Sequence, residues 1–138
     1  MIEIILAILG IVAAVISITL TNYFSKKNQL KFEERKLKEV HYIRFIDTVS
    51  EMLASSFTEK TRKDFAHIQN NLYLVASQEV VCNLVIFNDF LSTSQFSREK
   101  HNELLTNLIK AMRADLYGTH KVNTNYPIIE LRTVPLKK

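Results

Sequence analysis

The stretch IILAILGIVAAVISITLTNYFSKK, residues 4–27, decides how the chain is organised. Its first 21 residues, 4–24, carry no charge. As a helix they cover about 30 Å, the thickness of the hydrocarbon core of a bilayer. A cleaved secretory signal is disfavoured because Glu3 stands where a positive region belongs, and the apolar run ends in Thr-Asn-Tyr-Phe without a small-x-small site. The sequence therefore predicts a permanent transmembrane helix over residues 1–25.

The residues that follow this span predict its orientation. Tyr23 and Phe24 are aromatics of the kind found at membrane interfaces, and Ser25-Lys26-Lys27 supplies a positive flank. Positive flanks stay on the cytoplasmic side of a membrane. We therefore expect a single-pass membrane protein, with its N-terminus outside and its C-terminal domain in the cytoplasm.

Small side chains recur along one face of the span at intervals of three and four. They are Ala7, Gly10, Ala14, Ser17 and Thr21. In lipid, such a stripe lets helix backbones approach closely. The stripe predicts that the span associates with copies of itself, although small residues are also common in solitary membrane helices.

Composition limits what the rest of the chain can be. About 110 residues leave room for one small domain. After residue 24, 18 Lys and Arg residues stand against 13 Asp and Glu residues, a mild basicity that suits an anionic lipid surface or ligand. The single cysteine, Cys82, lies in the apolar run VVCNLVIF, so we expect a buried thiol in a reducing compartment.

The fold class expected from the sequence is all-α. Glycine and proline are absent between residues 11 and 117, which favours long helices over tight turns. Apolar periodicity predicts a cytosolic domain, 26–118, of three helices: about 26–53, about 58–90 with a possible interruption where Ser77 caps a new start, and 97–117. Ser97 is the expected cap of the third helix and Gly118 its end. Residues 119–138 read as an extended basic tail with one short strand in IIELRTV.

The chain lacks the motifs of most enzymes and cofactor-binding proteins. Two glycines cannot build a phosphate-binding loop, and neither an HExxH motif nor paired cysteines are present. We expect no cofactor, no metal and no enzymatic activity. One enzymatic alternative stays open, because HEPN-like RNases use Arg and His a few residues apart, and Arg35–His41, Arg62–His67 and Arg113–His120 have comparable spacings.

The third predicted helix carries a polar face opposite part of its leucines. Its members recur at helical spacing and continue just past the glycine: Asn102, Thr106, Lys110, Arg113, Tyr117, His120 and Lys121. Amides, hydroxyls, cations and an aromatic ring can together hold phosphates and a stacked base. We take this face as the candidate ligand-binding site; the alternative is a solvated surface.

The stretch HNELLTNLIKAMRADL, residues 101–116, behind a single N-terminal span is similar to small membrane proteins of bacterial mobile elements and defence islands. The layout of the whole chain resembles the ancillary membrane effectors of type III CRISPR systems. This resemblance implies binding of a cyclic oligoadenylate, in particular cyclic tetra-adenylate, by a homo-oligomer that then perturbs the membrane lipid. It implies a place in the bacterial inner membrane and no DNA partner. The other alternative is a membrane-anchored protein-interaction scaffold of a mobile element.

Overall fold

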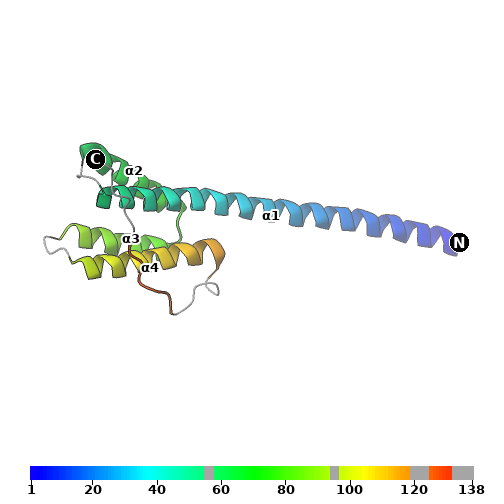
Figure 1. The fold of residues 1–138 in the computed structure, drawn as a ribbon. Helices are drawn as coiled ribbons and strands as arrows, with labels where there is room; N and C mark the ends of the chain where they lie inside the picture. The colour runs from blue at the N-terminus through cyan, green and yellow to red at the C-terminus, as the bar shows by residue number, and fades with distance from the viewer. Residues whose placement is uncertain (55–57, 94–96, 119–124, 132–138) are drawn as a thin grey trace. The chain divides into compact units, whose positions relative to one another are not determined.

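A computed structural model describes residues 1–54, 58–93, 97–118 and 125–131 (Figure 1). Four α-helices make up the ordered elements of these residues: α1 (Ile2–Ala54), α2 (Glu59–Val75), α3 (Gln78–Leu91) and α4 (Arg98–Tyr117). No strand occurs in the described ranges. The all-α prediction is confirmed, and the predicted first helix does continue from the apolar segment without a break.

The chain divides into two compact units, Met1–Lys36 and Leu37–Lys138. The predicted boundary after residue 25 marks the end of the apolar run and stays a prediction. Within the first unit, α1 is long and apolar enough to cross a membrane, and none of its most apolar window is buried. The Ser17 hydroxyl donates to the Ala13 carbonyl and the Thr21 hydroxyl to the Ser17 carbonyl, both at 2.8 Å, so these polar groups are satisfied within the helix.

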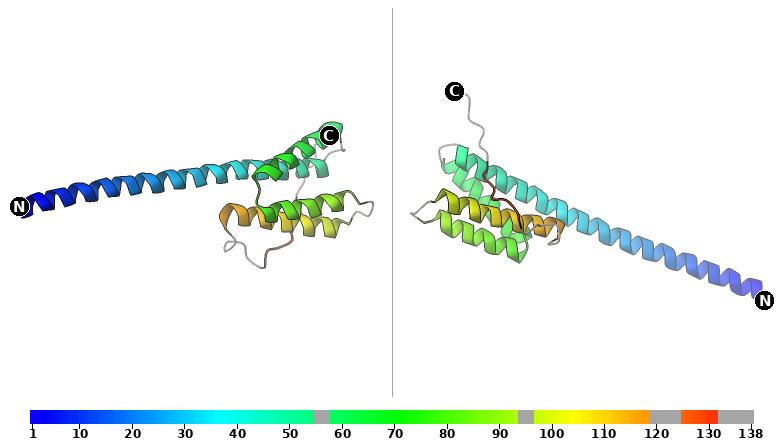
Figure 2. Two further views of the ribbon diagram at one scale, coloured as in Figure 1. Left: turned by 180° about the vertical axis from the view of Figure 1, so that it is seen from behind. Right: turned by 60° about the horizontal axis from the view of Figure 1, so that its bottom comes forward.

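The second unit is organised around one apolar core. Its fully buried side chains come from all four helices and are largest at Phe45, Leu72, Leu84, Phe87, Leu105 and Leu108. The Phe45 ring stacks on Phe65 with ring centres 5.8 Å apart and meets Phe87 at 6.4 Å, which joins α1 to α2 and α3. Helices α3 and α4 lie side by side (Figures 1 and 2).

The predicted second helix is two helices in the structure. α2 ends at Val75 and α3 begins at Gln78, at the interruption that the sequence allowed for. Thr58 caps α2 by accepting from the Thr61 amide at 3.2 Å. Ser77 occupies the cap position of α3, but its side chain makes no capping hydrogen bond, contrary to the sequence-based expectation.

The ends of α4 agree with the sequence. At the start of the helix, the Ser97 hydroxyl accepts from the Lys100 amide at 3.4 Å. At its end, Gly118 has a φ of 89°, a backbone conformation that residues with a Cβ rarely adopt. The predicted strand in IIELRTV is wrong for residues 128–131, which form no strand. A strand needs a neighbouring strand to pair with, and the neighbour here is a helix whose backbone groups are already bonded. Residues 132–134 lie outside the described ranges.

The prediction of a buried cysteine is also wrong, because Cys82 is exposed. The buried positions of α3 are Val80, Leu84 and Phe87, which recur at helical spacing. Cys82 is two residues from Val80, about 200° around the helix, so it falls on the opposite face. The apolar run that suggested burial surrounds the whole of α3, while the core covers only one side of it.

Candidate functional site: the polar face of α4

The polar face predicted on α4 meets a segment from the end of the chain. Residues 125–131 run along α4 in the opposite direction (Figures 1 and 2). The Ile129 amide donates to the Thr106 hydroxyl at 2.8 Å, and Arg98 forms an ion pair with Glu130. Leu131 packs against the core. We call residues 125–131 the tail segment.

The tail segment changes what Thr106 can do. This residue is only 3% exposed, and its hydroxyl also donates to the Asn102 carbonyl at 2.6 Å. The hydroxyl therefore has both of its roles filled within the fold. Thr106 was predicted to bind ligand from its spacing alone, and spacing does not report that another part of the chain uses the same group.

Two cations of the predicted face lie over the same aromatic ring of the tail segment. The Lys110 ammonium and the Arg113 guanidinium each lie 5.7 Å from the centre of the Tyr126 ring. This distance is within the range of about 6 Å over which an aromatic face attracts a cation. Lys110 is half-buried and Arg113 is exposed, so both heads remain near the surface. We call Lys110, Arg113 and Tyr126 the cation–ring cluster.

Sequence reasoning placed the aromatic ring of the site at Tyr117 and missed Tyr126. Tyr117 is half-buried in the last turn of α4. Tyr126 precedes a proline, which signals an extended backbone but not the helix beside which that backbone lies. The two remaining predicted residues, His120 and Lys121, lie outside the described residues.

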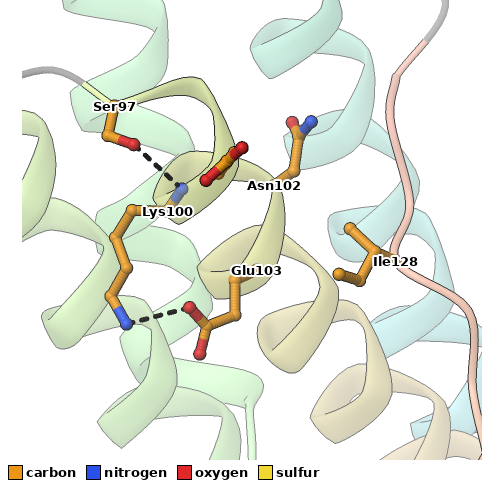
Figure 3. A pocket seen from close by; sticks show the side chains of 6 residues that line it. Ser97, Lys100, Asn102, Glu103 and Ile128 are labelled. Carbon is orange, nitrogen blue, oxygen red and sulfur yellow. Dashed lines mark hydrogen bonds and ion pairs between the residues drawn. The ribbon is translucent and has the colours of Figure 1, made fainter.

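Asn102 lies at the other end of the face, beside an open hollow of about 610 Å³. Figure 3 shows Ile128 of the tail segment close to Asn102, and Ser97, Lys100 and Glu103 around the start of α4. Lys100 and Glu103 form an ion pair of 2.9 Å. Because this hollow also contains Glu99, its two carboxylates disfavour an anionic ligand at this end.

A second polar arrangement, absent from the sequence-based predictions, centres on Asp115. Its carboxylate accepts from the Lys38 ammonium at 3.1 Å, from the Tyr42 hydroxyl, and from the Ser77 amide at 3.2 Å. The Asp115 side chain is 9% exposed and that of Lys38 is 16% exposed. Burial and the bond to Asp115 raise the pKa of the Tyr42 hydroxyl above its ordinary value, so this hydroxyl remains a donor.

The Asp115 arrangement also holds the residue that precedes α3. The carboxylate of Asp115 accepts from the backbone amide of Ser77, whereas a capping side chain would accept from an amide two or three residues further on. The carboxylate thereby ties α1, α4 and the α2–α3 junction together. The sequence offered one weak signal, since Lys38 and Tyr42 are four residues apart and so share a face of α1. We assign this arrangement a structural role, because every contact joins elements of the core.

Of the spacings compared with HEPN-like RNases, Arg35–His41 lies on α1 and Arg62–His67 on α2. Arg62 and His67 are both exposed on α2, and an interval of five residues sets them about 140° apart around one helix. His120, the partner of Arg113, lies outside the described residues. Among the residues that the structure describes, no three metal-ligating side chains gather in one place.

Comparisons with protein-family models, with curated proteins and with solved structures found no match to this chain.

Proposed function

We propose that this chain is a membrane-anchored sensor whose helical domain binds an anionic nucleotide at the cation–ring cluster. The observation that carries the proposal is that Lys110 and Arg113 approach the same aromatic ring. The ammonium and the guanidinium each lie 5.7 Å from the centre of the Tyr126 ring. A guanidinium and an ammonium bind phosphate oxygens through charge-assisted hydrogen bonds. A tyrosine ring beside them provides a surface on which a base stacks.

The resemblance to CRISPR ancillary effectors selects the ligand to test first, a cyclic oligoadenylate. Such a ligand presents several phosphates in a ring, and a homo-oligomer with rotational symmetry offers the same two cations from each subunit. In this proposal the ligand changes how the subunits pack, and the membrane spans respond. The chain then acts in antiviral defence as a binding protein and not as an enzyme.

The proposed topology places the ligand site in the bacterial cytoplasm, where such a second messenger is made. Lys26 and Lys27 follow the apolar run and favour a cytoplasmic position for everything after them. A reporter fused after Lys138 should be active in the cytoplasm. Activity only in the periplasm would reverse the orientation and remove the proposed ligand from reach.

The proposed response passes through the small-residue stripe of the span. A Cβ built on Gly10 would meet nothing within 4 Å, so the space beside this residue is open to a second helix. Gly10→Leu should lower chemical cross-linking between full-length chains in native membranes. Unchanged cross-linking would assign assembly to the helical domain instead.

Calorimetry on the full-length chain in detergent micelles tests the ligand. Cyclic tetra-adenylate should bind, and linear oligoadenylate should bind more weakly. Lys110→Ala should weaken binding about ten- to hundredfold per site, since a charge-assisted contact contributes about 1.5–3 kcal/mol. Lys60→Ala, at an exposed position in the first turn of α2, is the matched control. Absence of binding to the whole cyclic series, or equal binding by both variants, contradicts the proposal.

A further inference from the structure

An apolar hollow of about 220 Å³ lies between α1 and α4, within the unit Leu37–Lys138. It is separate from the hollow at the start of α4, and none of its lining residues belongs to the tail segment. Apolar side chains form most of its wall: Tyr42, Ile43, Ile46, Ile109, Met112 and Leu116. Two charged residues complete it, Asp47 from α1 and Arg113 from α4.

Part of the apolar wall of this hollow is left uncovered by the described residues, whereas Tyr42 and Met112 are buried. Ile43 is 54% exposed, and Val40, one turn earlier on α1, is 43% exposed. Residues 40, 43 and 47 follow each other at intervals of three and four and so share one face of the helix. Exposed apolar side chains that gather beside a hollow are typical of an interaction surface.

The charges at the hollow indicate the kind of partner. Helices α1 and α4 run antiparallel, as the contact of Lys38 with Asp115 and the ribbon in Figure 1 show. Asp47 from α1 and Arg113 from α4 line the same hollow. Within the described residues, Asp47 forms no ion pair and the guanidinium of Arg113 has only the Tyr126 ring beside it.

We propose that this hollow is the contact surface between the helical domains of two copies of the chain. A two-fold axis parallel to the helices sets α1 of one copy against α4 of the other, so that Asp47 of each copy faces Arg113 of its neighbour. One acid and one base at the same hollow make the surface its own complement. A strongly acidic or strongly basic partner would leave one of these two charges opposed by its own sign.

Attachment to one membrane favours this contact. Chains held at the same surface meet at an effective concentration far above their average concentration in the cell, so a small apolar contact with two ion pairs is sufficient. The contact does not require the nucleotide of the proposed function. Its test measures assembly without any ligand, so the two proposals fail separately.

Disulfide trapping in native membranes tests the contact directly. Cys82 is the only cysteine and is exposed, so Cys82→Ser gives a cysteine-free chain with little effect on folding. Two differently tagged chains on this background, one with Asp47→Cys and one with Arg113→Cys, are co-expressed and oxidised. We expect a disulfide between the two different chains. The chain that keeps only Cys82, on α3, is the control and should cross-link less.

A charge exchange provides an independent measurement. Full-length chains labelled with donor and acceptor dyes in lipid vesicles report the proximity of their domains by energy transfer. Asp47→Arg and Arg113→Asp should each lower the apparent association constant roughly tenfold, because two attractive pairs become repulsive. The double variant should restore it. The proposal is overturned if the mixed-cysteine chains cross-link no more than the Cys82 control, if they cross-link to another protein, or if the double variant stays as weak as the single ones.

Discussion

The two parts of α1 differ in what surrounds their apolar side chains. In the unit Met1–Lys36, large apolar residues are exposed on every side of the helix, with Ile4 65% and Leu9 59% exposed. In the unit Leu37–Lys138, one face of the helix is buried, and Phe45 and Val49 are 0% and 3% exposed. One covalent helix is therefore built for two surroundings. The described residues do not cover the apolar side chains of the first part, while the second part has a core of its own.

The largest expected effect comes from removing a buried ring from the core of the second part, which should leave the first part unaffected. Phe45→Ala should destabilise the helical domain by about 3–5 kcal/mol, because a fully buried ring is lost from the contact with Phe65 and Phe87. Membrane insertion should be unchanged. Denaturant unfolding followed by circular dichroism, with membrane flotation of the same variant, measures both. Phe32→Ala, at a 65% exposed position of the first unit, is the control that should leave the domain's stability unchanged.

A charge placed in the apolar segment should affect the first part and leave the second part unaffected. Ile11→Arg should make membrane insertion less favourable by about 2.5–3.5 kcal/mol, the cost of an arginine near the centre of a span. Ile11 is 65% exposed, so the helical domain should keep its stability. Fractionation of cells into membrane and soluble protein gives the result. Leu30→Arg, equally exposed but beyond the positive flank, should insert normally; equal behaviour of the two variants would mean that residues 4–24 do not span the bilayer.

A smaller effect tests the polar arrangement within the second unit. Asp115→Asn should cost about 1–3 kcal/mol of domain stability, because the mostly buried ammonium of Lys38 loses its charged partner. Asp64→Asn, at an exposed position of α2, should change little. The two variants are compared by urea unfolding. A loss for Asp115→Asn no greater than for the control would indicate that water replaces the carboxylate at no cost.

The smallest effect distinguishes the two helix caps. Ser97→Ala should destabilise α4 by about 1 kcal/mol, since its hydroxyl accepts from the Lys100 amide. Ser77→Ala should have less effect, because its side chain makes no capping bond and its amide is held by Asp115. Thermal melting of the two variants makes the comparison. A loss for Ser77→Ala as large as that for Ser97→Ala would contradict the absence of a side-chain cap at Ser77.

The helices could be predicted from the sequence because their signals are local. The scarcity of glycine and proline, the cap at Ser97 and the stop at Gly118 act within a turn or two of the chain. What could not be predicted depends on distant partners. The exposure of Cys82 follows from which side of α3 the core covers, and the occupation of Thr106 follows from where residue 129 returns to α4. The sequence-based site lies on α4 alone, whereas in the structure the ring beside its cations is Tyr126 of the tail segment.

Arg113 belongs both to the cation–ring cluster and to the wall of the apolar hollow. One guanidinium cannot neutralise a phosphate and the carboxylate of a second copy in full at the same time, so under the two proposals the two equilibria would compete for a shared charge. Thermodynamic linkage makes that competition reciprocal: the factor by which an anion weakens the pairing of domains equals the factor by which pairing weakens the affinity for the anion. A ligand that takes Arg113 would thereby loosen the paired state without any movement of the helices.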